Sequence, residues 1–248
     1  MGRRRARPGA PHVIAVTSGR GGAGVSLVSA LLAIGCAHTG RRTLLVDAEP
    51  WLDVQRVWLG LEKGLGLDEI GGDAVESLVV PVHGTLELLS LTAGPTSDRS
   101  VRGLMRRVPP LFHERDLVVL DVGTRITALE RLVDLRAGSV VVVSANDAIG
   151  LASTHAMLKA IHAQTDLPSS ILFNRSGESE TERSSAVLRE GARRFLGRDL
   201  SVLGALPEDP DLVHRLAAGS RLPEALVQSA LPNLVQPLLE RLLPPAAA

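Results

Sequence analysis

The chain has 248 residues, of which 45% are hydrophobic, and its 27 Lys and Arg residues balance its 27 Asp and Glu residues. This length and apolar content fit one large domain with a substantial core, and the charge balance provides no overall field that would attract nucleic acid or an anionic membrane. A single cysteine, Cys36, excludes an intrachain disulfide and a multi-cysteine cluster, and no apolar run reaches the roughly 18 residues of a membrane helix, so we expect a soluble cytoplasmic protein.

The first eleven residues differ in composition from the rest of the chain. Arginine occupies positions 3, 4, 5 and 7, and we expect residues 1–11 to form a flexible, solvated basic tail. From residue 12 to residue 245 no internal repeat and no long linker divides the sequence. We therefore expect one domain over residues 12–245.

Short runs rich in Val, Leu and Ile alternate with longer segments of helical periodicity. This alternation predicts an α/β fold with a mostly parallel sheet and helices on both faces. Between residues 78 and 92, two apolar runs flank Val82-His83-Gly84-Thr85 and predict a hairpin or an edge pair. The other expected strands are 12–17, 43–47, 117–121, 139–144, 170–173 and 201–206.

Several helical segments have one apolar face, which we expect to lie in the core. These faces fall within 126–135, which includes Val133, and within 187–195, which includes Val187 and Phe195. A helix that begins near Asp98 is expected to end at Pro109-Pro110. The C-terminal apolar stripe over 234–243 has a single basic neighbour, so we expect it to pack on the domain rather than bind a membrane.

A glycine-rich loop follows the first expected strand and precedes an apolar helix. It reads Gly19-Arg20-Gly21-Gly22-Ala23-Gly24-Val25-Ser26. Glycines permit positive φ and a close approach of backbone N–H groups to an anion, and the helix N-terminus adds partial positive charge. The pattern predicts a phosphate-binding loop, in which the Ser26 hydroxyl would face Mg²⁺. The lysine that a working loop carries directly before this serine is replaced by Val25.

At these residues the chain resembles the MinD/ParA branch of P-loop ATPases, whose loop reads G-K-G-G-x-G-K-[ST]. Arg20 stands at the first lysine, which in that family reaches the phosphates of a partner subunit, and Val25 stands at the second. The resemblance implies a P-loop NTPase-like fold, a homodimer as a possible assembly, and ATP or ADP with Mg²⁺ as the ligand. The loss of the second lysine implies that nucleotide binding is weak or absent and that hydrolysis is deficient.

Two aspartates end expected strands, at the sheet edge where open parallel sheets bind ligands. Asp47-Ala48-Glu49 resembles the D-x-D motif of the family, whose second carboxylate helps to place the attacking water; the resemblance implies Asp47 and Glu49 as degenerate catalytic residues. Asp121 resembles the Walker-B aspartate, which with Ser26 implies a Mg²⁺ site; the alternative is an aspartate that begins a loop or caps a helix. Arg125 stands at the last glycine of the D-x-G-x-G motif that follows, where the backbone should approach the γ-phosphate.

Two later motifs resemble the base-binding side of the same family. Asn174-Arg175 follows an expected strand, as does the Asn-Arg pair whose asparagine contacts adenine. Pro207-Glu208 lies in a segment similar to the Ile-Pro-Glu-Asp-Pro turn that lines the adenine pocket. Ordinary turn chemistry is the alternative for each motif taken alone. The resemblance implies a nucleotide-binding set made of residues 19–26 with Asn174, Arg175, Pro207 and Glu208.

The segments 47–60, 137–161 and 195–221 are similar to FlhG-type regulators of flagellar number and placement. This likeness implies a spatial regulator or scaffold of flagellar or polar assembly, with a protein partner such as an FlhF-like GTPase, at the membrane periphery or cell pole if not free in the cytoplasm. The N-terminal motif by which FlhG stimulates FlhF has no counterpart in residues 1–11. Two alternatives stay open: an active switch ATPase that dimerises on ATP, and a CpaE-like pilus-assembly or septum-site protein.

Overall fold

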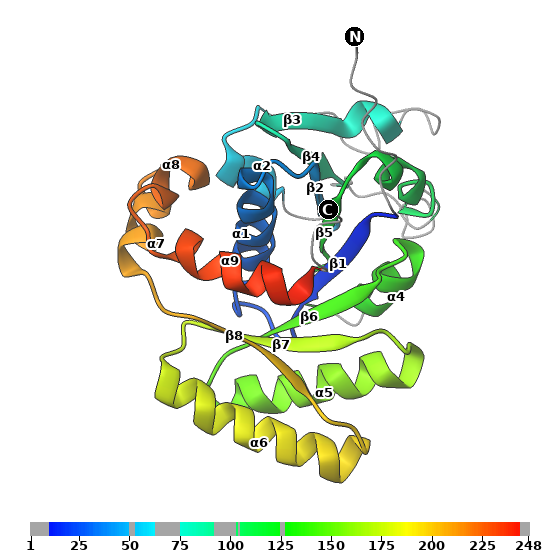
Figure 1. The fold of residues 1–248 in the computed structure, drawn as a ribbon, viewed down its shortest axis with the longest axis vertical. Helices are drawn as coiled ribbons and strands as arrows, with labels where there is room; N and C mark the ends of the chain where they lie inside the picture. Colours follow the sequence, from blue (N-terminus) through cyan, green and yellow to red (C-terminus); the bar gives the residue numbers. More distant parts are fainter. Residues whose placement is uncertain are drawn as a thin grey trace.

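A computed structural model describes residues 10–49, 53–62, 75–91, 103, 105–124 and 127–243 (Figure 1). The expected tail, except for its last two residues, lies outside this range, as do Arg125 and the start of the helix expected near Asp98. The described elements are β1 (His12–Thr17), α1 (Val25–His38), β2 (Thr43–Asp47), α2 (Val54–Leu59), the 3₁₀ helix η1 (Val75–Leu78), β3 (Val79–His83), β4 (Leu86–Ser90), the 3₁₀ helix η2 (Pro109–Glu114), β5 (Leu117–Asp121), α4 (Thr127–Asp134), β6 (Ser139–Ser144), α5 (Ala148–Gln164), β7 (Ser169–Asn174), α6 (Glu178–Leu196), β8 (Ser201–Leu206), α7 (Pro210–Ala217), α8 (Leu222–Leu226) and α9 (Leu231–Leu242).

The strands form one sheet in the order β3-β4-β2-β5-β1-β6-β7-β8. Only β3 and β4 pair antiparallel among the described strands, and they form the hairpin predicted between residues 78 and 92. The parallel pairs require helical crossovers, which the segments between the strands provide. The α/β fold with a mostly parallel sheet is confirmed.

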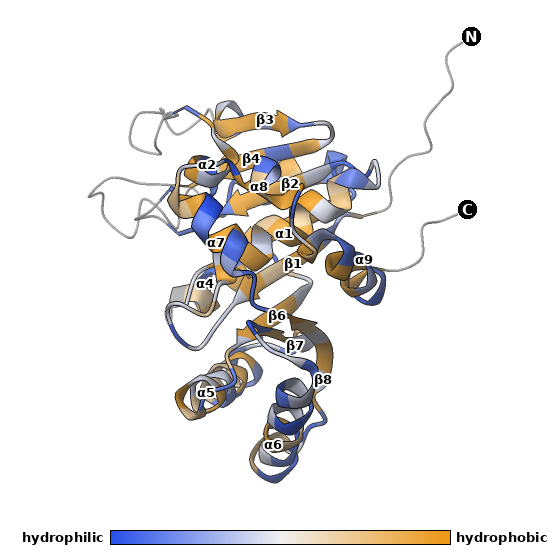
Figure 2. Cartoon of the chain, turned by 90° about the vertical axis from the view of Figure 1, so that its left-hand side faces the viewer, coloured by the Kyte–Doolittle hydropathy of each residue, from blue (hydrophilic) through white to orange (hydrophobic). Residues whose placement is uncertain are grey.

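Alternate side chains of the central strands enter two different apolar layers. In β1, Ala15 packs with α4, α5 and α6 on one face, whereas Ile14 and Val16 pack with α1, α7, α8 and α9 on the other. This follows from the two-residue period of a strand, and it explains why the central strands are continuous apolar runs. The hydropathy colouring shows apolar strands between the two sets of helices (Figure 2).

Two expectations about the helices need correction. The segment expected to be helical from near Asp98 is helical at Gly103 and Met105 and ends at Met105, before Pro109-Pro110, which begin the separate 3₁₀ helix η2. Prolines suit this position because a proline in the first turn needs no N–H partner and its fixed φ suits a helix start. Val133, Val187 and Phe195 are 60%, 58% and 67% exposed rather than buried. In α6 the buried positions are Ser184, Ser185, Leu188 and Ala192. Val187 directly precedes the buried Leu188, and Val133 directly follows the buried Leu132, so each is turned by about 100° from a core position. Phe195 lies in the last turn of α6, where its ring contacts His155 and Arg194 instead of the core.

The C-terminal helix α9 packs against α1 and β8, as its apolar stripe predicts. Val235, Leu238 and Leu239 are buried, and a Cβ built on Gly35 of α1 would lie 2.9 Å from Val235 Cγ1. The glycine therefore permits close helix packing. Among the described residues no helix combines the length and the apolar character needed to cross a membrane.

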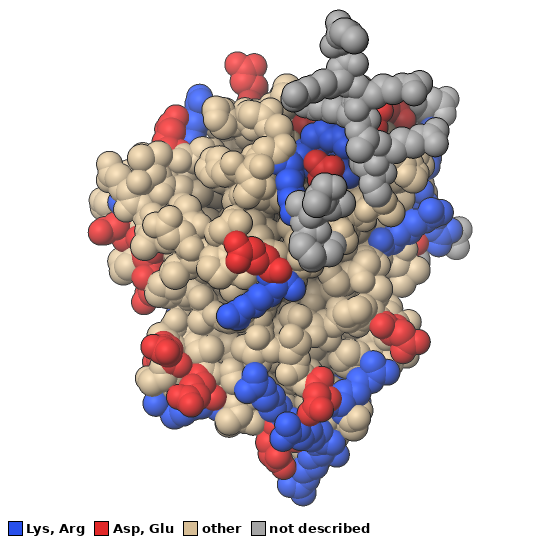
Figure 3. All heavy atoms as spheres, viewed as in Figure 1, with Lys and Arg blue, Asp and Glu red and all other residues tan. Residues whose placement is uncertain are grey.

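Acidic and basic side chains are interspersed over the face seen in Figure 1, with basic side chains gathered at its lower end, where α6 lies (Figure 3). Arg193 and Arg198 in this region form ion pairs with Asp199 and Asp166. These pairs are exposed and contribute little to stability.

Candidate functional site

The glycine-rich loop connects the end of β1 to the start of α1 and curves around a hollow of about 310 Å³. Gly22 and Gly24 adopt positive φ angles of 76° and 94°, which glycine accepts without strain. The remaining walls come from the carboxyl ends of β2 and β5 and from α2. The lining residues are Gly21, Gly22, Gly24, Val25, Ser26, Leu27, Asp47, Glu49, Val54, Trp58, Asp121, Gly123 and Thr124.

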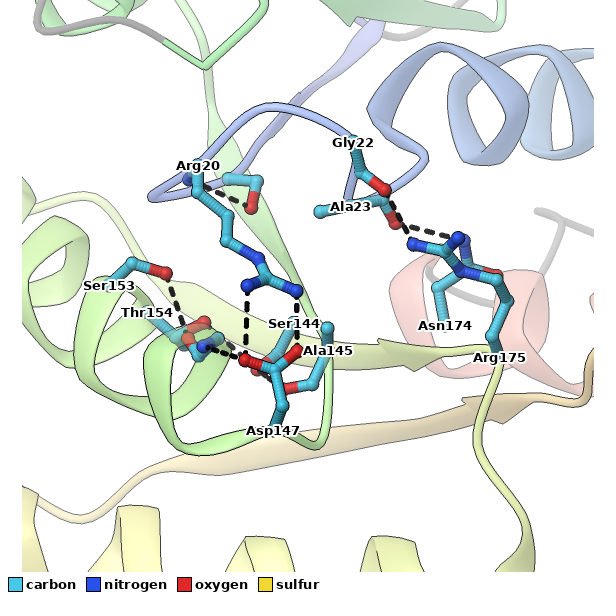
Figure 4. Close-up of polar contacts among 12 residues, drawn as sticks. Arg20, Gly22, Ala23, Ser144, Ala145, Asp147, Ser153, Thr154, Asn174 and Arg175 are labelled. Carbon is cyan, nitrogen blue, oxygen red and sulfur yellow. Dashed lines mark hydrogen bonds and ion pairs between the residues drawn. The ribbon is translucent and has the colours of Figure 1, made fainter.

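Two side chains at the end of β7, from Asn174 and the next residue Arg175, hold the loop from outside (Figure 4). Asn174 Nδ2 donates to the Ala23 carbonyl at 2.9 Å, and Arg175 Nη2 donates to the Gly22 carbonyl at 2.5 Å. A Cβ on Gly24 would lie only 2.2 Å from Asn174 Nδ2. The close approach of Asn174 thus requires glycine at position 24, and the loop conformation depends on a strand some 150 residues further along the chain.

Arg20 turns away from the hollow and forms a two-pronged ion pair with Asp147 of its own chain (Figure 4). The two bonds measure 3.0 Å for Nη1 to Oδ1 and 2.5 Å for Nη2 to Oδ2. Asp147 is also the N-cap of α5, because its Oδ1 accepts the Gly150 N–H at 2.9 Å. This backbone bond and the Arg20 guanidinium both lower the pKa of Asp147. Arg20 is therefore fixed between the loop and α5.

Asp47 and Asp121 end adjacent strands and lie opposite each other in register. Both side chains are buried, at 1% exposure. Burial, and then the charge of Asp121, raises the pKa of Asp47 well above its ordinary value. Burial likewise raises the pKa of Asp121, although hydrogen bonds from the side chains of Ser26 and Gln55 oppose the shift. The wall opposite the loop is thus a close pair of buried acids.

Glu49 is held by a cation from α4. Arg131 Nη1 lies 3.3 Å from Glu49 Oε2 and donates to the Val122 carbonyl at 2.7 Å. A Cβ on Gly123, which has φ 73°, would lie 2.3 Å from Glu49 Oε2. The Glu49 carboxylate therefore rests against the Gly123 backbone, with the Arg131 side chain, which is 8% exposed, behind it.

The structure brings together one part of the predicted nucleotide site and separates another. Val25, Ser26, Asp47, Glu49 and Asp121 share the hollow with the loop glycines 21, 22 and 24. The other predicted residues do not line it: Gly19, Arg20, Ala23, Asn174, Arg175, Pro207 and Glu208. Of these, Pro207 and Glu208 are exposed and follow β8, whose last residue pairs with Asn174.

Several residues of the site were missed from the sequence. Trp58 lines the hollow, and Gln55, Arg131 and Asp147 hold its walls through side-chain bonds. Asp147 had a signal, since it follows an expected strand and precedes a helical segment. Gln55 and Arg131 had none, because their carboxylate partners lie 66 and 82 residues away in the chain.

The donor set suits Mg²⁺ better than it suits the phosphates that would accompany it. Ser26, Asp47 and Asp121 offer hard oxygen atoms, which Mg²⁺ prefers. No Lys or Arg side chain is found among the described residues that line the hollow. In the described part of the chain, no group of three or more His, Cys, Asp or Glu side chains is placed to hold a metal ion unaided. The loop therefore retains the shape of a phosphate site without a cation facing it.

Comparison with known sequences places this geometry in a wider context. The profile of the CobQ/CobB/MinD/ParA nucleotide binding domain matches residues 14–222. The antiactivator FleN of Pseudomonas aeruginosa is 26% identical over 213 residues, which cover 80% of this chain and 74% of FleN. The septum site-determining protein MinD of Thermotoga maritima is 22% identical over 227 residues, which cover 87% of this chain and 81% of that MinD.

Solved structures share the fold at lower identity. MinD of Pyrococcus horikoshii, complexed with Mg-ADP, superposes with a TM-score of 0.71 at 19% identity, covering 93% of this chain and 95% of that one. The MinC:MinD cell division protein complex of Aquifex aeolicus superposes with a TM-score of 0.72 at 20% identity, with the same shares covered. At these identities the structural likeness establishes the fold alone.

Proposed function

The chain belongs to the CobQ/CobB/MinD/ParA nucleotide-binding family, and we propose that it is a degenerate, MinD- or FlhG-like member that hydrolyses ATP weakly or not at all. In this proposal it acts as a spatial regulator or scaffold of a flagellar or polar assembly. The likeness to FleN, which is described as an antiactivator, supports a regulatory rather than a metabolic role.

One observation carries the proposal: the loop keeps its shape while an aliphatic side chain stands where its cation belongs. Val25 is the first residue of α1, lines the hollow and is 5% exposed. A cation at the transferring phosphoryl group is worth about 10³–10⁵ in rate. A charge-assisted contact to a bound phosphate is worth roughly 1.5–3 kcal/mol. Loss of the cation therefore reduces hydrolysis more than binding.

A nucleotide can still bind in this scheme, with the residues of the site in reduced roles. The loop amides would face the phosphates, and Ser26 and Asp121 would hold Mg²⁺. The ion, when bound, would neutralise phosphate charge. The proposed partners are another copy of the chain, as in ATP-bound dimers of the family, and a protein of the assembly; a MinD relative forms a complex with MinC.

Calorimetry with ATP or ADP in the presence of Mg²⁺ tests the proposal. We expect the wild-type protein to bind more weakly than about 100 μM. The Val25→Lys variant should bind ATP about ten- to a hundredfold more tightly, because position 25 faces the hollow and the new ammonium can reach the phosphates.

Two results would contradict the proposal. One is ATP turnover by the wild-type protein at the rate of active family members, with loss of that turnover on Ser26→Ala. The other is an ATP-dependent increase in mass by light scattering together with such turnover, which would establish the alternative of an active dimerising switch. A Val25→Lys variant that binds no better would show that the hollow has closed to phosphate for another reason.

A further inference from the structure

Gln55 of α2 joins three separate parts of the site. Its side chain is fully buried, and its amide nitrogen Nε2 donates both to Asp121 Oδ2 and to the Ser26 carbonyl, each at 2.9 Å. Its backbone N–H donates to Asp47 Oδ2 at 3.3 Å. One residue therefore contacts the ends of β2 and β5 and the start of α1.

The chemistry of these partners fixes the orientation of the amide. The Ser26 carbonyl oxygen and the carboxylate oxygen of an ionised Asp121 can accept hydrogen bonds but cannot donate them. The end of the Gln55 amide that faces both of them must therefore be its NH₂ group. The opposite end, Oε1, is buried and has no hydrogen-bond partner among the described residues. A buried polar atom left without a partner is unfavourable. The hydrogen bond to Asp121 is thus kept although it leaves Oε1 of the same amide buried without a partner among the described residues.

We propose that the Gln55 amide is an internal substitute for a divalent cation at Asp121, so that an ion must displace it in order to bind. In the proposed function, the ion would be held by the Asp121 carboxylate and the Ser26 hydroxyl. The inference rests on the proposed function only for this placement of the ion. The NH₂ group offers the carboxylate a partial positive charge without bringing in an ion. Gln55 therefore sets how weakly the site binds a divalent cation.

The arrangement of α2 is consistent with this role. The helix spans only Val54–Leu59 and carries two residues, Val54 and Trp58, that line the hollow, while Gln55 points to the acids. Gly60 ends the helix with φ 68°. Trp58, which lines the hollow, and Gln55, which binds the acids, therefore belong to the same short helix.

Binding of Mn²⁺ alone, without nucleotide, tests the proposal directly. Free Mn²⁺ is measured by electron paramagnetic resonance in titrations of the wild-type protein and of Gln55→Leu, which keeps most of the side-chain volume and removes the amide. We expect Gln55→Leu to bind Mn²⁺ at least about fivefold more tightly, a difference of about 1 kcal/mol in binding free energy.

Gln236→Leu is the matched control. Gln236 is an exposed glutamine on α9, and among the described residues its amide donates a hydrogen bond to Glu240. Its Mn²⁺ affinity should equal that of the wild type. Equal or weaker binding by Gln55→Leu would overturn the proposal.

A second variant covers the case in which Gln55→Leu does not fold. Gln55→Glu places a third carboxylate beside Asp121 and Asp47, so its stability should depend on an ion at that point. We expect Mn²⁺ to raise the Tm of Gln55→Glu by several degrees more than that of the wild type, and the added Asp121→Asn change to remove the difference. The same Mn²⁺ shift in Gln55→Glu and in the wild type would show that the amide does not occupy an ion position.

The outcomes separate this inference from the proposed function. Tighter Mn²⁺ binding by the Gln55 variants together with rapid ATP turnover by the wild type would support the proposed role of the Gln55 amide and contradict the proposal of a degenerate ATPase. Weak ATP binding by the wild type without any gain in Mn²⁺ affinity in the variants would contradict the role of the amide and leave the proposal of a degenerate ATPase standing.

Discussion

At the scale of single residues, positions 20, 25 and 131 explain why the hollow is acidic. Position 25 carries valine, and the Arg20 guanidinium is directed to Asp147. Arg131 neutralises Glu49 from inside the protein wall instead of facing the cavity. As a result, Asp47 and Asp121 have no Lys or Arg side chain beside them among the described residues that line the hollow.

The buried aspartate pair makes stability depend on pH in a defined direction. Because the folded-state pKa of Asp47 is raised, the folded protein binds more protons than the unfolded chain between the ordinary aspartate pKa of about 4 and the raised value. This contribution to stability is complete below that interval and is lost as pH rises through it. We expect Asp47→Asn, which removes the buried charge, to gain stability relative to the wild type at pH 8 and to lose this advantage at pH 4.5.

Urea unfolding of both proteins at the two pH values measures this effect. The quantity to compare is the difference between variant and wild type, because the groups that do not interact with Asp47 titrate equally in both proteins and cancel. A difference that is constant with pH, or that grows in favour of the variant as pH falls, would contradict the assignment of a raised pKa to Asp47.

At the scale of elements, the loop between β1 and α1 owes its shape to neighbours distant in sequence. Asn174 and Arg175 fasten the carbonyls of Ala23 and Gly22, and a Cβ on Gly19 would lie 2.0 Å from the Ser153 carbonyl oxygen of α5. Gly19 and Gly24 are therefore needed for contacts within the protein itself. This explains how the loop can hold its conformation with valine at position 25 and no Lys or Arg side chain among the described residues of the hollow.

Alanine substitutions along the loop should separate these roles. Gly24→Ala introduces strain at φ 94° and a contact with Asn174 Nδ2, and we expect it to lower the free energy of unfolding by about 1–3 kcal/mol. Gly21→Ala is the matched control, because its Cβ would meet nothing within 4 Å and the change should stay within about 0.5 kcal/mol. Chemical denaturation measures both. Equal effects would mean that the Asn174 contact does not constrain the loop.

At the scale of the whole molecule, the sheet separates two apolar layers, and α9 completes one of them. Leu239 of α9 is 3% exposed and lies among the side chains of α1, whereas Leu234 on the same helix is 39% exposed. An amphipathic helix that binds a membrane must have a free apolar face. Here that face is occupied by the domain itself.

Truncation of α9 side chains tests this packing. Leu239→Ala should cost about 2–4 kcal/mol in the free energy of unfolding, because it removes buried methyl groups and leaves a cavity against α1. Leu234→Ala should cost less than about 1 kcal/mol, since that side chain is already partly solvated. A small and similar cost for both variants in urea unfolding would indicate that α9 is not docked in solution.

Much of the fold could be predicted because its signals are local. The six strands expected outside the hairpin agree with the structure to within one residue at each end, since a buried strand in a parallel sheet is a short apolar run. The apolar faces of α4 and α6 were predicted less well, because one extra apolar residue at a helix surface shifts the apparent face. Val187 and Phe195 carry no sequence mark that separates them from Leu188.

The sequence by itself determined the α/β fold, the glycine loop and the two acids at the strand ends, because periodicity, glycine content and strand-terminal position are properties of adjacent residues. The tertiary structure alone decided which charges face the hollow. Arg20 meets Asp147, Arg131 meets Glu49 and Gln55 meets Asp121 across 127, 82 and 66 residues of chain. Such pairs are set by how the packed sheet brings distant segments together, and no local pattern encodes that.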